Sequence, residues 1–144
     1  QLVASCDLAY ASESSKFATP GVNIGLFCST PMVALSRVAK NKHSMEMLLT
    51  GDFINANKAK SIGLINNYFN ENEIVNATRE IAIKIANKSS QTLKIGKKAF
   101  YNQAEMKISD AYKYASEIMI ENMMNQVSEE GIAAFLEKRE PNWS

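Results

Sequence analysis

The 144-residue chain has the length of one ordinary domain, and its 46% hydrophobic and 22% charged residues are usual for a globular core. Its 16 basic and 15 acidic residues give a formal net charge of +1, so no strong field favours nucleic acid or an anionic membrane as partner. No apolar run reaches the length of about 18 residues that spans a bilayer, which favours a soluble protein without a membrane span.

The first part of the chain predicts a helix end followed by two short strands. Residues 1–7 are typical of the last turns of a helix without an N-cap, which suggests that other residues precede them. Two extended segments follow, Leu8–Ala11 and Lys16–Ala18, and the polar turn Ser12–Ser15 separates them. Strand-forming residues around such a turn predict a hairpin-like region.

A loop and then a series of helices are predicted next. Pro20 and Gly21 interrupt regular structure, so residues 19–30 are expected to form a loop over the sheet, of the kind that carries function. Helical periodicity dominates from Pro31 onward. The first predicted helix carries Met32, Leu35 and Val38, and the second carries Met45, Leu48 and Leu49 and ends at Gly51. A third helix runs from its N-cap Asn55 through Lys60 and is closed by Gly63. Two longer helices carry apolar residues from Ile74 to Ile85 and from Ala111 to Met123. Residues 64–69 form a brief extended return, residues 92–106 a less regular helix around Gly96, and residues 128–139 a last helix with Ser128 as N-cap.

The few strands and the scarcity of metal-binding residues limit what the chain does alone. So few strands do not form a stable sheet, so we expect further strands upstream of Gln1 or on another chain. Two cysteines, Cys6 and Cys28, have no metal-ligand spacing, and with His43 as the single histidine they argue against a metal site. They are expected to be small buried or half-buried thiols, although a disulfide between them stays open, and His43 is expected at the surface or at a helix cap.

An ordered set of short motifs along the chain then points to a known family. The motifs are Cys6-Asp-Leu-Ala-Tyr-Ala11, Phe17-Ala-Thr-Pro20, Met47-Leu-Leu-Thr-Gly-Asp52, Ile54-Asn-Ala56, Ala59, Gly63-Leu64 and Glu130-Gly-Ile-Ala-Ala-Phe-Leu-Glu-Lys-Arg139. Together they resemble the enoyl-CoA hydratase/isomerase, or crotonase, superfamily, and the segment from Phe17 to Pro31 resembles one branch of it. The resemblance implies an α/β, crotonase-like spiral fold, of which this chain matches the mostly helical C-terminal half with a few short strands.

That resemblance also implies a division of the chain and a class of ligand. Residues 1–69 would end the spiral core and carry the active-site loop, and residues 70–144 would form a C-terminal helical region for trimerisation. The ligand would be an acyl-CoA thioester, with no cofactor besides the coenzyme A of the substrate. The two backbone N–H groups that stabilise the developing enolate would lie before Gln1, so an upstream N-terminal half is expected to complete the site.

The catalytic carboxylates of the family are missing from the matching positions. Family hydratases use two glutamates, because water needs a base to attack and the neighbouring carbon needs a proton source. The first glutamate matches Gln1 and the second matches Gly21. A glutamine amide has no useful titration, although it can hold a water, and glycine has no side chain. Asp7 and Glu13 are the nearest possible substitutes, but Asp7 is more simply a structural hydrogen-bond partner and Glu13 a solvated charge.

The resemblance also assigns residues to the acyl pocket and to coenzyme A. The expected acyl-pocket residues are Gln1, Thr19, Pro20, Gly21, Asn23, Leu26, Phe27 and Cys28. The thiol of Cys28 is conceivable as a nucleophile but lacks a nearby histidine, so a lining role is favoured. Lys138 matches a lysine that reaches the adenosine phosphate of coenzyme A bound to a neighbouring subunit, with a solvated surface charge as the alternative. Met119 matches an adenine contact or a core position.

Two functions therefore stay open on the sequence. The first is an enoyl-CoA hydratase/isomerase-type lyase or isomerase of fatty acid metabolism that binds acyl-CoA without the usual glutamate pair. The second is a catalytically silent acyl-CoA-binding or scaffold protein. The Met119, Met123 and Met124 run predicts a helix core or a subunit interface, consistent with a homotrimer or hexamer. No targeting segment is visible, so the cytoplasm and the mitochondrial matrix both remain possible.

Overall fold

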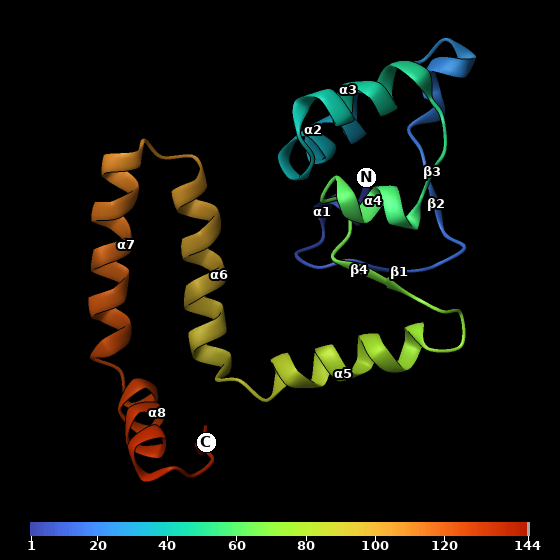
Figure 1. The fold of residues 1–144 in the computed structure, drawn as a ribbon. Helices are drawn as coiled ribbons and strands as arrows, with labels where there is room; N and C mark the ends of the chain where they lie inside the picture. The colour runs from blue at the N-terminus through green and yellow to red at the C-terminus, as the bar shows by residue number, and fades with distance from the viewer. Residues whose placement is uncertain (144) are drawn as a thin grey trace. The chain divides into compact units, whose positions relative to one another are not determined.

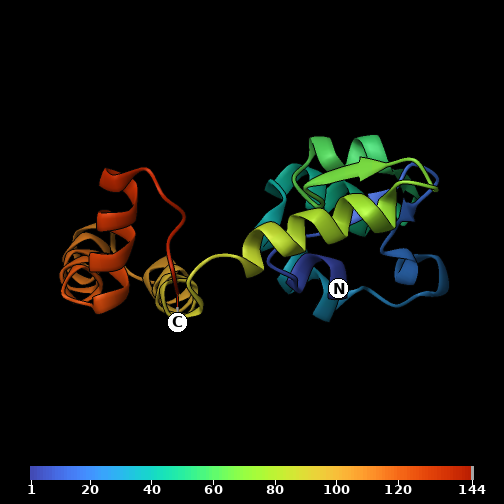
Figure 2. The same cartoon turned by 90° about the horizontal axis from the view of Figure 1, so that it is seen from below.

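The computed structural model describes residues 1–143, which fall into two compact units: unit 1 is Gln1–Glu80, and unit 2 begins at Ile81 (Figures 1 and 2). Unit 1 contains α1 (Leu2–Ser5), β1 (Tyr10–Ser12), β2 (Lys16–Phe17), the 3-10 turn η1 (Pro20–Ile24), α2 (Ser29–Val38), α3 (Asn41–Thr50), β3 (Ile54–Asn55), α4 (Ala56–Ser61) and β4 (Asn67–Phe69). Helix α5 (Ile74–Ala86) spans the boundary, and unit 2 continues with α6 (Ser90–Ala104), α7 (Ile108–Met123) and α8 (Gln126–Glu137). The division at residues 69 and 70 expected from the sequence stays a prediction about the roles of the two parts.

The strands pair with distant partners rather than with each other. β1 pairs in parallel with β4, with Tyr10 opposite Asn67, and β2 pairs antiparallel with β3, with Lys16 opposite Asn55. The expected hairpin is therefore wrong. The turn after β1 keeps that strand on β4, because the Glu13 N–H donates to the Phe69 carbonyl at 2.8 Å, and the chain then leaves for β3. Both extended segments thus use partners supplied by residues that follow α3.

Several helix ends follow the sequence signals and two do not. The Asn55 side chain accepts the Lys58 N–H at 2.9 Å, and Gly51 ends α3 with φ of 66°, both as predicted. The expected loop over residues 19–30 is only partly correct, because a proline at the first position lets η1 form and α2 already begins at Ser29. The N-cap of α8 is Asn125, because the Ser128 hydroxyl donates to the Asn122 carbonyl and lies inside the first turn.

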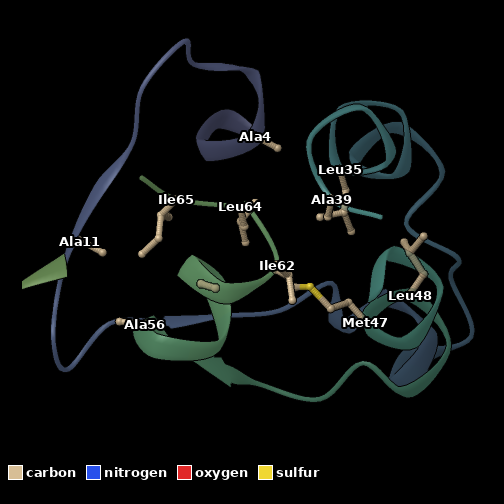
Figure 3. Close-up of a cluster of buried hydrophobic side chains, with 11 residues drawn as sticks. Ala4, Ala11, Leu35, Ala39, Met47, Leu48, Ala56, Ile62, Leu64 and Ile65 are labelled. Atoms are coloured by element: carbon tan, nitrogen blue, oxygen red, sulfur yellow. The ribbon is translucent and has the colours of Figure 1, made fainter. Parts of the chain in front are cut away.

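The core of unit 1 gathers apolar side chains from α1, α2, α3 and α4 and from the segments that flank them. Figure 3 shows this cluster with Ala4 of α1, Leu35 of α2, Met47 and Leu48 of α3, and Leu64, and the Met47 side chain extends toward Ile62. Leu48 is 1% exposed, and Ala59 on α4 is fully buried. Because alanines occupy many positions, backbones approach closely, and the helices hold the loop that carries the predicted site against this core.

Unit 2 is an open arrangement of helices with little buried apolar surface. α6 and α7 run side by side (Figure 1), and α6 is a continuous helix through Gly96, with the Ser89 hydroxyl capping the Thr92 N–H at 3.2 Å. Ala111 and Ala134 are the buried hydrophobic residues described in this unit. Across residues 1–143, no helix is long and apolar enough to cross a membrane.

Candidate functional site

A cavity of about 240 Å³ in unit 1 brings together two of the residues predicted for the acyl pocket, Gln1 and Thr19. The remaining lining residues are Val3, Ala4, Lys16, Phe17, Ala18, Pro31, Leu35, Met47 and Leu64. Four of these, Ala4, Leu35, Met47 and Leu64, also belong to the core cluster in Figure 3, so one wall of the cavity is the core itself. A small space with apolar walls and a few polar groups suits a small, largely apolar ligand.

Thr19 fixes the predicted loop to the end of α3. Its hydroxyl donates to the Met47 carbonyl at 2.8 Å, and the residue is buried. An unpaired hydroxyl at such a depth would be costly, so this bond both satisfies Thr19 and pins the start of η1. The Thr19 hydroxyl therefore serves mainly as a structural anchor, and Gln1 is the other residue with a neutral polar side chain that lines the cavity.

The turn that follows closes on Gly21. The Leu26 N–H donates to the Gly21 carbonyl at 2.9 Å. A Cβ atom added at residue 21 would lie 2.4 Å from the Leu26 carbonyl oxygen and 2.8 Å from the Cys28 Sγ. Real Cβ atoms do not approach backbone oxygen so closely, so the turn as folded accepts only glycine at this position. Residue 21, where the resemblance places a carboxylate, has no room for any side chain.

The other predicted pocket residues cluster on this turn and do not line the cavity. The Asn23 Oδ1 lies 2.9 Å from the place that a Cβ on Gly51 would take, so Asn23 packs on the end of α3. Pro20 is exposed, as are Leu26 and Phe27. Cys28 is half-buried and packs against the core. Cys6 and Cys28 are both free thiols, so the disulfide that the sequence left open is not formed.

The carboxylates considered as substitutes lie elsewhere in unit 1. Neither Asp7 nor Glu13 is among the residues that line the cavity. Glu13 lies on the exposed turn after β1, beside Ser14 and Glu71, as expected for a solvated charge. His43 is a partly exposed surface residue whose Nδ1 lies 3.8 Å from Glu46 Oε2. Residues 1–143 contain no group of three or more histidine, cysteine or acidic residues suited to a metal ion.

One charged residue of the cavity was missed by the sequence analysis. Lys16 is the ionisable side chain among the described residues that line the cavity, and its backbone pairs with Asn55. The sequence placed it correctly in an extended segment but gave no sign of which face it takes. The signal that could have found it is its position three residues before Thr19, on the approach to the predicted loop.

The residues predicted for coenzyme A lie in unit 2. Met119 on α7 is 59% exposed, so in this chain it is available for contact and is not a core residue. Lys138 is exposed at the end of α8, where its backbone takes the left-handed conformation with φ of 56°. Next to it, Arg139 binds Glu130 through two hydrogen bonds of 2.6 and 2.9 Å. These charge-assisted bonds lower the pKa of Glu130 to about 2.

Comparisons with known proteins agree with this arrangement. The sequence model of the family described as Enoyl-CoA hydratase/isomerase matches residues 1–144. The chain is 49% identical to the Homo sapiens protein "Enoyl-CoA hydratase domain-containing protein 3, mitochondrial" and 47% identical to its Xenopus laevis counterpart, in each case over 100% of this chain. It spans about half the length of these curated relatives, 48% and 49% respectively.

A solved structure gives the same result for the fold. The crystal structure of human enoyl Coenzyme A hydratase domain-containing protein 3 superimposes with a TM-score of 0.96 at 48% identity, covering 99% of this chain and 56% of that one. The crotonase-like fold class predicted from the motifs is therefore confirmed. So is the resemblance of the segment from Phe17 to Pro31 to one branch, which is the branch of these relatives.

Proposed function

The chain belongs to the enoyl-CoA hydratase/isomerase family, and on this premise we propose that the protein binds an acyl-CoA thioester but does not hydrate it by the family's two-glutamate mechanism. The observation that carries the proposal is the closed turn at Gly21, where a Cβ would meet the Leu26 carbonyl oxygen at 2.4 Å. Hydration needs a group that takes a proton from water and a group that gives one to carbon. Neither Gln1 nor Gly21 can exchange a proton in this way.

The cavity supports thioester binding with a different set of groups. Its apolar walls suit the acyl chain, and the Gln1 amide can donate a hydrogen bond to a carbonyl oxygen or hold a water molecule. Lys16 also lines the cavity, and an ammonium group there can donate hydrogen bonds that stabilise negative charge on the ligand. Any reaction would therefore depend on stabilising an enolate-like charge, with the oxyanion donors supplied by upstream residues.

The experiment compares binding with turnover in one protein. A thermal-shift series with acyl-CoA esters of increasing chain length, run beside product analysis, should show stabilisation by short esters and no hydrated product. Gln1→Ala is expected to weaken the thermal shift by removing the amide from the cavity. Fast hydration of crotonyl-CoA that is unchanged in Gln1→Ala would contradict the proposal.

The missing carboxylates also favour a second candidate, a catalytically silent acyl-CoA-binding or scaffold protein. Binding without any product in the series above would favour this candidate over an enzyme with another reaction. A product formed from a thioester other than an enoyl-CoA would favour the enzyme. Both candidates thus bind the same ligand, but only the first converts it into a product.

Assembly and location are further parts of the proposal. Large apolar side chains on α7 and α8 are exposed in this chain, among them Met119, Met123, Phe135 and Leu136. A soluble protein seldom exposes such a group, so we propose that another subunit covers it in a homotrimer or hexamer. Sedimentation of the protein and of Phe135→Asp should then give an assembly that the variant loses. Because the names of the relatives include the word "mitochondrial", we also propose a mitochondrial location for this protein.

A further inference from the structure

The backbone of Lys138 takes a conformation that needs support from elsewhere in unit 2. Lys138 is the one non-glycine residue with positive φ among the described residues, at φ 56° and ψ 40°. L side chains seldom adopt this conformation, because Cβ approaches the following carbonyl oxygen. Two bonds fold the chain back here: the Lys138 N–H donates to the Phe135 carbonyl at 3.3 Å, and the Arg139 N–H donates to the Ala134 carbonyl at 3.0 Å.

The reversal leads into residues 139–143, which we call the C-terminal strap, and Glu130, which follows the first turn of α8, holds this strap. Arg139 Nη1 donates to Glu130 Oε1 at 2.6 Å and Nη2 to Oε2 at 2.9 Å, while its Nε donates to Glu137 Oε2 at 2.6 Å. The Asn142 N–H donates to the same Glu130 Oε1 at 2.7 Å. One carboxylate therefore binds both the start and the later part of the strap.

The far end of the strap is seated on the junction of α5 and α6. The Trp143 Nε1–H donates to the Asn87 carbonyl at 3.0 Å, and Figure 2 shows the strap returning from the end of α8 toward α6. A Cβ added at Gly131 would lie 3.3 Å from Trp143 Cη2, so the absence of a side chain there leaves room for the ring. Two neighbouring residues of the motif thus hold the strap in place: the Glu130 carboxylate binds it through hydrogen bonds, and Gly131 leaves room for the Trp143 ring.

The geometry also separates the two cations at the end of α8. The Arg139 guanidinium donates hydrogen bonds from Nε, Nη1 and Nη2 to the carboxylates of Glu137 and Glu130, so these donors are already occupied within the protein. Lys138 is exposed and makes no ion pair within residues 1–143. Its ammonium is therefore the cation available to an anionic ligand, and the direction in which it leaves the helix depends on the fold-back that the strap maintains.

We propose that Glu130 is a positioning residue for coenzyme A, which acts through Arg139 and the C-terminal strap to direct Lys138 toward the phosphate on the adenosine ribose. This inference rests on the proposed binding of an acyl-CoA thioester and on the contact of Lys138 with that phosphate, which the family resemblance implies. Glu130 itself does not touch the ligand. It is ionised at neutral pH, because the hydrogen bonds from Arg139 and from the Asn142 N–H keep its pKa near 2.

The test measures how far the protein prefers coenzyme A over dephospho-coenzyme A, which lacks that phosphate, using calorimetric titration of the purified protein. The wild type is expected to prefer coenzyme A by roughly tenfold, the scale of one charge-assisted contact, and Lys138→Ala to lose this preference. Glu130→Gln should lose most of it while its affinity for dephospho-coenzyme A is unchanged. The matched control is Glu129→Gln, because Glu129 is the exposed residue next to Glu130 on α8, and it should behave as wild type.

Trp143 is the single tryptophan of the chain, so its fluorescence reports whether the strap is seated. Glu130→Gln should expose Trp143 to iodide quenching, and Arg139→Lys, which keeps the charge but loses the two-pronged contact, should give an intermediate result in both measurements. A Glu130→Gln variant that keeps the wild-type preference, while Lys138→Ala loses it, would overturn this inference and leave the proposed function standing. Loss of preference with Trp143 still protected would also overturn it. A wild type without any preference would refute the role of Lys138, and this inference with it.

Discussion

Unit 1 and unit 2 are each stabilised by a different kind of internal interaction. Unit 1 contains one cluster of eleven buried side chains, two of them on α4, and its strands join residues far apart in sequence. Unit 2 buries only Ala111 and Ala134 among its described hydrophobic residues, and its end is closed by the Glu130–Arg139 pair and Trp143. The cavity lies in the first unit and the exposed Lys138 in the second. Buried side-chain packing therefore stabilises unit 1, whereas unit 2 is closed by polar contacts at its end and leaves large apolar side chains of α7 and α8 exposed.

The largest effect that tests this difference is expected from the core of unit 1. Leu48→Ala should lower the free energy of unfolding by about 2–5 kcal/mol, since Leu48 is 1% exposed and a cavity would remain. Leu49→Ala is the matched control, because Leu49 follows in the same helix but is 60% exposed, and its loss should be well under that of Leu48→Ala. Urea denaturation measures both. Equal losses for the two variants would contradict the core described for unit 1.

A glycine of unit 1 should resist replacement. Gly51→Ala is expected to destabilise the protein by about 1–2 kcal/mol, because residue 51 has φ of 66° and a Cβ would lie 2.9 Å from Asn23 Oδ1. The variant should also disturb the turn that Asn23 belongs to. Thermal unfolding measures the first effect and acyl-CoA binding the second. An unchanged melting temperature would show that this end of α3 is not constrained.

A glycine of unit 2 should behave in the opposite way. Gly96→Ala is expected to stabilise α6 by about 0.5–1 kcal/mol, because residue 96 lies inside the helix and nothing lies within 4 Å of the added Cβ. The gain should appear in the same denaturation experiment as the loss at Gly51. A loss at residue 96 would indicate that another surface packs closely against α6 in the assembled protein.

The smallest effect concerns the pH dependence of the strap. The pKa of Glu130 is lowered from 4.5 to about 2 by its hydrogen bonds with Arg139 and Asn142, so its stabilising effect is complete above pH 4.5 and is lost as the pH falls toward 2. Trp143 fluorescence should follow this loss. The Glu130→Gln variant should lack this acid transition in fluorescence. If Glu130→Gln shows the same transition as the wild type, the transition belongs to another carboxylate.

The sequence predicted the parts of the fold that depend on local chemistry. Asn55 and Gly51 mark helix ends by cap and turn preferences that act within a few residues, and both were correct. The partners of β1 and β2 were missed because a strand does not encode which distant strand it joins. The prediction of Ser128 as a cap is wrong because its hydroxyl has the chemistry of a cap but lies three residues after Asn125, the actual N-cap of α8.

The candidate site was predicted less completely, for a similar reason. The motifs identified the loop and the family, and Gln1 and Thr19 do line one cavity. Whether Leu26, Phe27 and Asn23 face that cavity depends on the path of the turn after Pro20, which contacts between Gly21 and Leu26 determine. Lys16 went unnoticed because the face taken by a two-residue strand follows from its pairing with β3.

Calorimetric binding and hydration of crotonyl-CoA by the wild type and by Gly21→Glu test the central claim most directly. The wild type is expected to bind the ester without forming the hydrated product. Gly21→Glu should not gain hydration and should unfold at a lower temperature, because its Cβ would lie 2.4 Å from the Leu26 carbonyl oxygen. Hydration by the wild type, or a Gly21→Glu protein that gains hydration at unchanged stability, would contradict the claim that the turn at residue 21 is closed to a catalytic carboxylate.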